Sequence, residues 1–395
     1  MGKEVVFKMI KVAKNIYEVG AVDWNLRNFH GYSTARGSSY NAYLIVDEKV
    51  ALIDTVKRPF AETMLSNIRE IIDPGKIDYI ISNHVEPDHS GSLPVIANAA
   101  VNARVLTSDP SGLAGLKAYY GADFEFSPVK SGDSLKLGVH TLSFVQTPMV
   151  HWPDNMVTYC PEEKLLFSND AFGQHLASSK KFDDENDFPI IMEEAAKYYA
   201  NIVLPYSKQV EGIMKIVRSL DIDIIAPSHG IIFRSAAGAI LDKYDYFASS
   251  ESENKAVVVY DSMWGSTESM ARAIMKGLIK SGLTVSLYDL KYNHISDIIT
   301  DVMKAKYVAV GSPTLNNNMM PSVAAFLTYM KGLVKIKKKA FAFGSFGWGG
   351  QSIGLVNEAL ISCGFEIVLD PIKQKFAPLC ENLDAITQKV ISIID

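Results

Sequence analysis

The sequence has few cysteines, and none of them belongs to a paired motif. Cys160, Cys363 and Cys380 stand far apart among 395 residues, without a Cys-x-x-Cys pair. This scarcity argues against a disulfide framework, a zinc ribbon and a rubredoxin-type iron centre. A reducing, cytoplasmic compartment therefore fits the sequence best.

Long apolar runs and basic clusters are scarce as well. No run reaches the roughly 20 residues that a membrane span needs. The start, MGKEVVFKMIKVAKNIYEVG, lacks the apolar core and cleavage site of a signal peptide. The net charge is −5, so no long-range field attracts nucleic acid or an anionic membrane. The one dense basic run, KIKKK at 335–339, precedes an expected strand and is predicted to be a solvated turn.

What is present indicates two globular domains. The composition, 48% hydrophobic and 21% charged, is typical of soluble globular proteins, and 395 residues exceed one ordinary core. The first half mixes β-rich runs with helices; a turn at DEK and another at PEEK predict antiparallel hairpins. A polar stretch at 249–255 separates the halves, so we predict domains at 1–251 and 252–395.

The second half alternates strictly between apolar strands and amphipathic helices. The expected strands lie at 256–262, 284–290, 307–313, 339–347 and 365–370. Five such strands separated by helices predict a doubly wound parallel sheet.

The stretch SNHVEPDHSGSLP, at 82–94, concentrates metal-ligand side chains directly after the apolar run IDYIIS. Three further candidates stand at the ends of other expected strands. A lone histidine there is more often a packed residue, and a lone aspartate can cap a helix. Seven donors at strand ends instead predict a metal site, and two metals sharing one carboxylate would use them all. The seven are His84, Glu86, Asp88, His89, His151, Asp170 and His229.

The pattern His-x-Glu-x-Asp-His, with His, Asp and His downstream, resembles the metallo-β-lactamase-like domain of flavodiiron proteins. The resemblance implies an αββα sandwich that holds two irons. It assigns three ligands to one iron, three to the other and one as the bridge: His84, Glu86 and His151; Asp88, His89 and His229; and Asp170. His89 is the ligand whose ring could swing away and leave water in its place.

Glu86 stands where zinc hydrolases of this superfamily usually carry histidine. A carboxylate adds a hard oxygen donor and favours redox-active iron, although zinc also accepts carboxylates. Asp54, at the end of the run VALIDT, is either a carboxylate that orients a ligand histidine or a turn cap. The resemblance to dioxygen-preferring members places His30 and Tyr198 near the open side of the irons as hydrogen-bond or proton donors; a merely structural role is the alternative.

The loop SMWGSTES follows the first strand of the second half and opens a helix. Its small and hydroxylated residues can present backbone N–H groups and hydroxyls to a phosphate. No lysine follows as in a Walker loop, and no Gly-x-Gly-x-x-Gly occurs. One phosphate in a flavodoxin-like fold indicates flavin mononucleotide (FMN) at the carboxyl ends of the strands.

Two further loops, GSPTLNNNMMP and GSFGWGGQS, resemble the ring-binding loops of flavodiiron flavodoxin domains; ordinary turns and packing are the alternative. The predicted FMN contacts are Ser262, Met263, Trp264, Gly265, Ser266, Thr267, Pro313, Thr314, Leu315, Asn316, Asn317, Ser345, Phe346, Gly347, Trp348, Gly349 and Gly350.

The resemblance covers nearly the whole chain, in family order, and implies an oxidoreductase of the two-domain class. Such an enzyme reduces dioxygen to water, nitric oxide to nitrous oxide, or both. Electrons would come from an external donor, a rubredoxin-like protein or a deazaflavin, and pass through FMN to the irons. The resemblance also implies a head-to-tail homodimer. Two alternatives stay open: a metallo-β-lactamase-type zinc hydrolase with a regulatory flavodoxin domain, and a flavoprotein that only shuttles electrons or senses gas.

Overall fold

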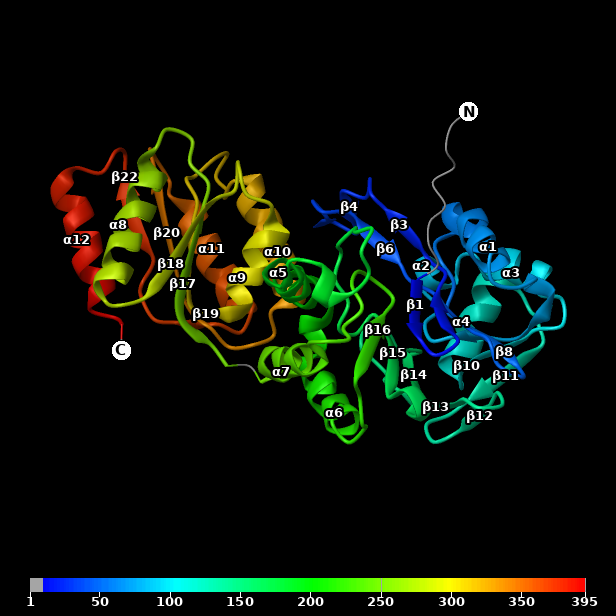
Figure 1. Cartoon of the computed structure of the whole chain (residues 1–395). Coiled ribbons are helices and arrows are strands. Elements are labelled where there is room, and N and C mark those ends of the chain that lie inside the picture. The colour runs from blue at the N-terminus through cyan, green and yellow to red at the C-terminus, as the bar shows by residue number, and fades with distance from the viewer. Residues whose placement is uncertain (1–9, 250, 395) are drawn as a thin grey trace, which may run out of the picture. The chain divides into compact units, whose positions relative to one another are not determined.

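A computed structural model describes residues 10–249 and 251–394 (Figure 1). Residues 1–9, 250 and 395 lie outside the described residues. The prediction that the sequence starts without a signal peptide rests in part on residues 1–9. The chain forms two compact units. The first contains the residues up to Phe29, Thr34–Tyr198 and Lys208–Ala248; the second contains His30–Ser33, Tyr199–Ser207 and the residues from Ser249 on.

The first unit contains two mixed sheets. One has the strand order β1-β2-β7-β8-β9-β10-β11, and the other has the order β12-β13-β14-β15-β16. The first sheet comprises Ile10–Ala13, Ile16–Glu18, Tyr43–Ile45, Val50–Ile53, Ile77–Ser82, Arg104–Ser108 and Phe126–Val129. The second comprises Ser134–Lys136, Thr141–Gln146, Met156–Cys160, Leu165–Asn169 and Ile224–Pro227. The antiparallel pairs β7–β8 and β14–β15 confirm the two hairpins predicted from the turns DEK and PEEK.

Strand alternation gives the first sheet two buried faces. Tyr43 and Ile45 of β7 point into a core shared with Phe144 and Phe167 of the second sheet. Leu44, between them, points into a second core under the helices. The result is the predicted αββα sandwich. Its helices are α1 (Ala61–Arg69), α2 (Pro87–Ser90), α3 (Leu93–Ala99), α4 (Ser111–Tyr120), α5 (Phe188–Tyr198), α6 (Ser207–Val217) and α7 (Ala237–Ala248).

The second unit is built on a parallel sheet with the order β18-β17-β19-β20-β21, which confirms the doubly wound fold. The strands are β17 (Glu253–Tyr260), β18 (Thr284–Asp289), β19 (Ala305–Gly311), β20 (Lys339–Phe346), β21 (Glu366–Ile367) and β22 (Ile372–Lys375). The helices are α8 (Ser266–Lys280), α9 (Ile295–Lys304), α10 (Pro321–Leu333), α11 (Gln351–Ser362) and α12 (Cys380–Ile391). Successive strands are added on one side of β17 with β18 and on its other side from β19 on. This fold class binds its ligand at that switch between β17 and β19.

Two expectations for the second unit need correction. The predicted strand 365–370 is only a two-residue strand, β21, and β22 continues the pairing along β20 after Pro371. The run 335–339 is not entirely a solvated turn. Lys338 is buried, and its Nζ donates to the Met303 carbonyl at 2.8 Å.

Membrane-spanning helices were not expected from the hydropathy of the sequence. Across the described residues, every helix is too short or too polar to cross a bilayer.

Candidate metal centre and flavin site

The loop after β9 is held in place by a buried carboxylate. Asp54 accepts hydrogen bonds from the backbone N–H of Asn83 at 2.7 Å and from its side-chain amide at 3.1 Å. The Ser90 hydroxyl closes the loop by donating to the carbonyl of Val85 at 2.6 Å. Asp54 therefore fixes the backbone that carries the candidate ligands. It accepts no described hydrogen bond from a ligand histidine, so the predicted contact with a ligand ring is not observed.

The remaining candidates come from the ends of the second sheet. Asp170 follows β15 directly, and His229 comes two residues after β16. His151 lies in the loop between β13 and β14. The structure brings all seven predicted metal ligands together in two adjoining groups within the first unit.

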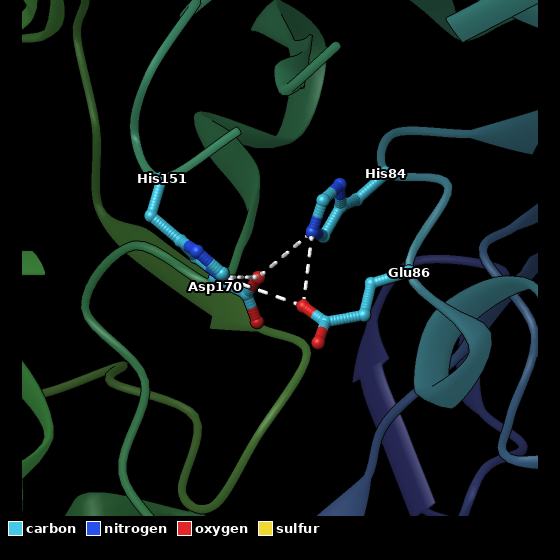
Figure 2. Close-up of side chains that lie close together, drawn as sticks. All are labelled: His84, Glu86, His151 and Asp170. Carbon is cyan, nitrogen blue, oxygen red and sulfur yellow. Dashed lines mark hydrogen bonds and ion pairs between the residues drawn. The ribbon is translucent and has the colours of Figure 1, made fainter. Parts of the chain in front are cut away.

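The first group contains His84, Glu86, His151 and Asp170 (Figure 2). The Nε2 atom of His84 lies 3.3 Å from a Glu86 oxygen, and that of His151 lies 3.2 Å from Oδ2 of Asp170. Figure 2 shows the four side chains pointing toward one another: His84 and Glu86 come from the loop after β9, and His151 and Asp170 come from two other loops. Two imidazoles and two carboxylates thus face a common centre.

The second group contains Asp88, His89 and His229. The Nε2 atom of His229 lies 3.2 Å from Oδ2 of Asp88. Asp170 reaches this group with its other oxygen, because its Oδ1 lies 3.0 Å from Nε2 of His89. One carboxylate therefore presents one oxygen to each group, which is the geometry required of a bridge.

Several buried polar atoms of these groups have no hydrogen-bond partner among the described residues. They are both oxygens of Asp88, both ring nitrogens of His89, and Oδ2 of Asp170. Buried polar atoms are nearly always hydrogen-bonded, and isolated exceptions call for an explanation. Buried ligand atoms that converge on shared points without hydrogen-bond partners fit metal ligation, in which each imidazole would offer one nitrogen. The mixed imidazole and carboxylate set fits two iron ions.

Charged side chains of the cluster shift one another's pKa values. Burial favours the neutral form of Asp170, but the charge of nearby His89 holds the pKa of this carboxyl well below its usual range. Burial likewise opposes the charged form of His89, but Asp170 and Asp88 raise its pKa to about 9. Protons on histidines thus balance the carboxylates. A divalent cation would take over that balance and release the protons.

Two ligand histidines are oriented by partners that the sequence did not single out. His84 donates from Nδ1 to Asp154 at 2.8 Å, and His229 donates from Nδ1 to the Ser39 carbonyl at 2.7 Å. These bonds leave each Nε2 lone pair for a metal. Asp154 takes the role that was considered for Asp54. It lies three residues after His151, but nothing in its spacing marked it.

Tyr198 lies at the cluster, whereas His30 is grouped with the second unit. The Tyr198 hydroxyl donates to Oδ1 of Asp170 at 3.0 Å. Burial and the Asp170 charge raise the pKa of Tyr198 well above its usual range, so the hydroxyl keeps its proton. His30 is an exposed residue in the turn between β4 (Asn28–Phe29) and β5 (Tyr32–Ser33), and its predicted place near the irons stays a prediction.

Sequence reasoning missed His175, which packs against the second group. Its ring centroid lies 4.9 Å from that of His229 and 5.1 Å from that of Tyr198. Burial and neighbouring His229 lower the pKa of His175 well below its usual range, so the ring is neutral. Its position five residues after Asp170 was the only available signal.

The three predicted flavin loops follow β17, β19 and β20, which are adjacent strands of the parallel sheet. Direct bonds join them. The Thr267 and Ser345 hydroxyls are 2.8 Å apart, and the Thr314 N–H donates to the Ser345 carbonyl at 3.0 Å. The structure therefore brings residues of all three loops together at the carboxyl ends of the strands.

The first of these loops fits a phosphate. Gly265 precedes α8 in the left-handed conformation, with φ of 84°, and no side chain caps the helix. The first-turn N–H groups of a helix have no partner within the helix and attract an anion. Thr267 and Ser262 add buried hydroxyls. The predicted flavin contacts differ in exposure: Ser345 is buried, whereas Trp264 of the phosphate loop and Trp348 of the third loop are 92% and 82% exposed.

Comparison with known proteins agrees with both units. Residues 39–230 match a family described as ODP family beta lactamase, and residues 258–388 match the flavodoxin family. The chain is 47% identical to a nitric oxide reductase from Moorella thermoacetica, over 92% of each chain.

Solved structures give the same result. A rubredoxin oxygen:oxidoreductase from Desulfovibrio gigas has a TM-score of 0.94 at 39% identity, covering 98% of each chain. The flavodiiron protein from Giardia intestinalis has a TM-score of 0.94 at 37% identity, covering all of this chain and 97% of the other. The zinc hydrolase alternative finds no support among these relatives.

Proposed function

The chain belongs to the flavodiiron protein family, and on that premise we propose that it reduces dioxygen to water, nitric oxide to nitrous oxide, or both. It is an oxidoreductase whose cofactors are two irons and FMN. Either reaction would remove a reactive gas from the cell. The observation that carries the proposal is the convergence of seven metal-ligand side chains on two adjoining centres within one unit.

We assign His84, Glu86 and His151 to one iron, and Asp88, His89 and His229 to the other. Asp170 would bridge them, since its two oxygens face different groups. When bound, the irons would bind and reduce the diatomic substrate with electrons that FMN supplies. The predicted loop residues 262–267, 313–317 and 345–350 would hold FMN.

Other side chains of the first unit set the hydrogen bonding and the charge beside the cluster. Tyr198 keeps its proton and donates to Asp170, so it can supply a hydrogen bond beside the irons. His175 is neutral and buried, which keeps an additional positive charge out of the cluster. A role for His30 as a proton donor stays a prediction.

The electron donor is a rubredoxin-like protein in this proposal, because the Desulfovibrio gigas relative is named for a reaction between rubredoxin and oxygen. A head-to-tail homodimer and a cytoplasmic location belong to the same proposal. The dimer is supported by family membership alone, and the location by the three cysteines without a paired motif.

A metal and turnover assay tests the function. Protein produced with iron and flavin available is analysed for metals, then supplied with reduced rubredoxin under dioxygen or under nitric oxide. We expect two irons and one FMN per chain, with consumption of at least one gas. Zinc in place of iron, with neither gas consumed, would favour the hydrolase and contradict the proposal. The ratio of the two rates identifies the preferred substrate.

A further inference from the structure

The loop that follows β17 starts beside a buried negative charge. Asp261 is buried and accepts a hydrogen bond from the Ser262 N–H at 2.6 Å. Its other oxygen accepts from the hydroxyl of Ser322, in the first turn of α10. Asp261 thus shapes the loop but places a carboxylate next to the position where a phosphate would bind. The carboxylate would repel a phosphate dianion, and a nearby cation would offset that repulsion.

Lys291 is a cation that reaches the start of this loop from the turn after β18. Its Nζ donates to the carbonyl of Ser262 and lies 3.6 Å from Oδ1 of Asp261. The side chain is 43% exposed, so it lies at the edge of the site. Lys291 therefore contacts the backbone of the loop and faces the carboxylate behind it.

The turn that carries Lys291 is well fixed. Asp289, the last residue of β18, accepts from the Lys291 N–H with Oδ1 at 2.9 Å and from the Tyr292 N–H with its carbonyl at 3.1 Å. The Leu290 N–H donates to the Tyr260 carbonyl at 2.9 Å, which ties the turn to β17. The backbone at Lys291 is therefore already ordered, so only side-chain conformational entropy is lost when the lysine acts.

A pocket beside this loop is lined by a second cation, Arg272, which is already paired. Arg272 lies 2.8 Å from Glu268, one turn before it on α8. Lys291 and Arg272 line the pocket together with Ser262, Gly265, Glu268 and Asp289. With Arg272 paired to Glu268, Lys291 is the better placed of the two to balance Asp261 and a phosphate.

We propose that Lys291 is a positioning residue for the flavin phosphate: it holds the Ser262 carbonyl and balances Asp261, so that the loop and the start of α8 accept a dianion. This inference rests on the proposed function, because it assumes that the loop binds FMN. It assigns a role to a lysine outside the three predicted flavin loops.

Flavin titration tests the inference. Flavin-free full-length protein is titrated with FMN and, separately, with riboflavin, which has the same ring but no phosphate, while flavin fluorescence is followed. Lys291→Met should weaken FMN binding by about tenfold, the change expected for losing a charge-assisted contact. Riboflavin binding should change by less than about twofold, because an uncharged ligand gains little from the lysine. Lys291→Arg should restore most of the FMN affinity.

Lys280→Met is the matched control, because Lys280 is an exposed lysine at the far end of α8; it should bind both flavins normally. Unchanged FMN binding by Lys291→Met would overturn the inference, and so would equal weakening for both flavins, which indicates general damage. Failure of the unsubstituted protein to bind either flavin would instead overturn the proposed function and the inference with it.

Discussion

Asp170 offers one carboxylate oxygen to each half of the metal cluster, and this makes it the residue whose loss matters most. Its Oδ1 lies near His89 and its Oδ2 near His151. Asp170→Ala should remove most of the iron, because both ions lose a ligand and the buried histidines lose the charge that balances them. Iron per chain, measured by elemental analysis, checks this.

Asp184→Ala is the control for that experiment, since Asp184 is a partly exposed residue of the same unit that pairs with Arg234. It should keep about two irons. A normal iron content in Asp170→Ala would refute the bridging assignment.

The clustering of the seven candidate ligands was predictable from the sequence, because each follows an apolar run and their types match a metal site. The residues that orient them were not. Asp154 binds His84, and the Ser39 carbonyl binds His229, through contacts between chain segments far apart in sequence. A main-chain carbonyl has no sequence signature. His175 was missed for a similar reason, since it lies near His229 only after β15 and β16 pair.

At the scale of elements, Asp47 joins the two sheets of the first unit. It lies in the turn between β7 and β8 and accepts hydrogen bonds from the Val139 N–H at 3.1 Å and the His140 N–H at 2.7 Å, in the turn between β12 and β13. The His140 ring adds a third bond at 2.8 Å. Burial disfavours its charge, but these donors lower the pKa of Asp47 to about 2.

A carboxyl with a lowered pKa stabilises the fold above its unfolded pKa of 3.8 and loses that contribution as pH falls through about 2. Asp47→Ala should therefore lower the free energy of unfolding at pH 7 by about 2 kcal/mol. The difference from the unsubstituted protein should shrink below about pH 4. Urea unfolding at several pH values measures it. Exposed Glu48→Ala is the control. Equal losses of unfolding free energy in both variants would argue against the role of Asp47 in joining the two sheets.

The phosphate loop depends on Thr267, whose buried hydroxyl meets Ser345 of the third flavin loop. Thr267→Glu should expel FMN, because a carboxylate would stand where the phosphate binds and would repel it. Iron content should stay normal, since the metal ligands belong to the other unit. Flavin absorbance per chain checks the loss. Exposed Thr284→Glu, in the same unit, should keep its flavin; full flavin occupancy in Thr267→Glu would mean that the loop is misassigned.

The order of the elements could be predicted where continuous apolar runs were separated by clear turns or helices, as in β7–β8 and in the parallel sheet. It could not be predicted for β22, because three of the four residues of IKQK are polar and Pro371 precedes it. The burial of Lys338 was also hidden, because its partner is the Met303 carbonyl at the end of α9. Local sequence does not encode such a tertiary partner.

At the scale of the whole molecule, the irons and the flavin belong to different units of one chain, so electrons must cross between units. Electron tunnelling weakens steeply with distance. A closed two-fold dimer brings each partner's second unit to the other's first unit, twice over. On the proposed function, we therefore expect flavin in one subunit to serve iron in the other.

Mixing two inactive variants tests this arrangement. Asp170→Ala lacks iron, and Thr267→Glu lacks flavin, so each is inactive alone. Under conditions that let subunits exchange, half of the dimers are mixed, and each mixed dimer has one intact flavin facing one intact iron pair. Activity should return to about a quarter of the unsubstituted value. Transfer within one chain predicts no recovery, because neither chain contains both cofactors. Subunit exchange demonstrated by mass spectrometry of differently labelled chains, without recovered gas reduction, would exclude transfer between subunits.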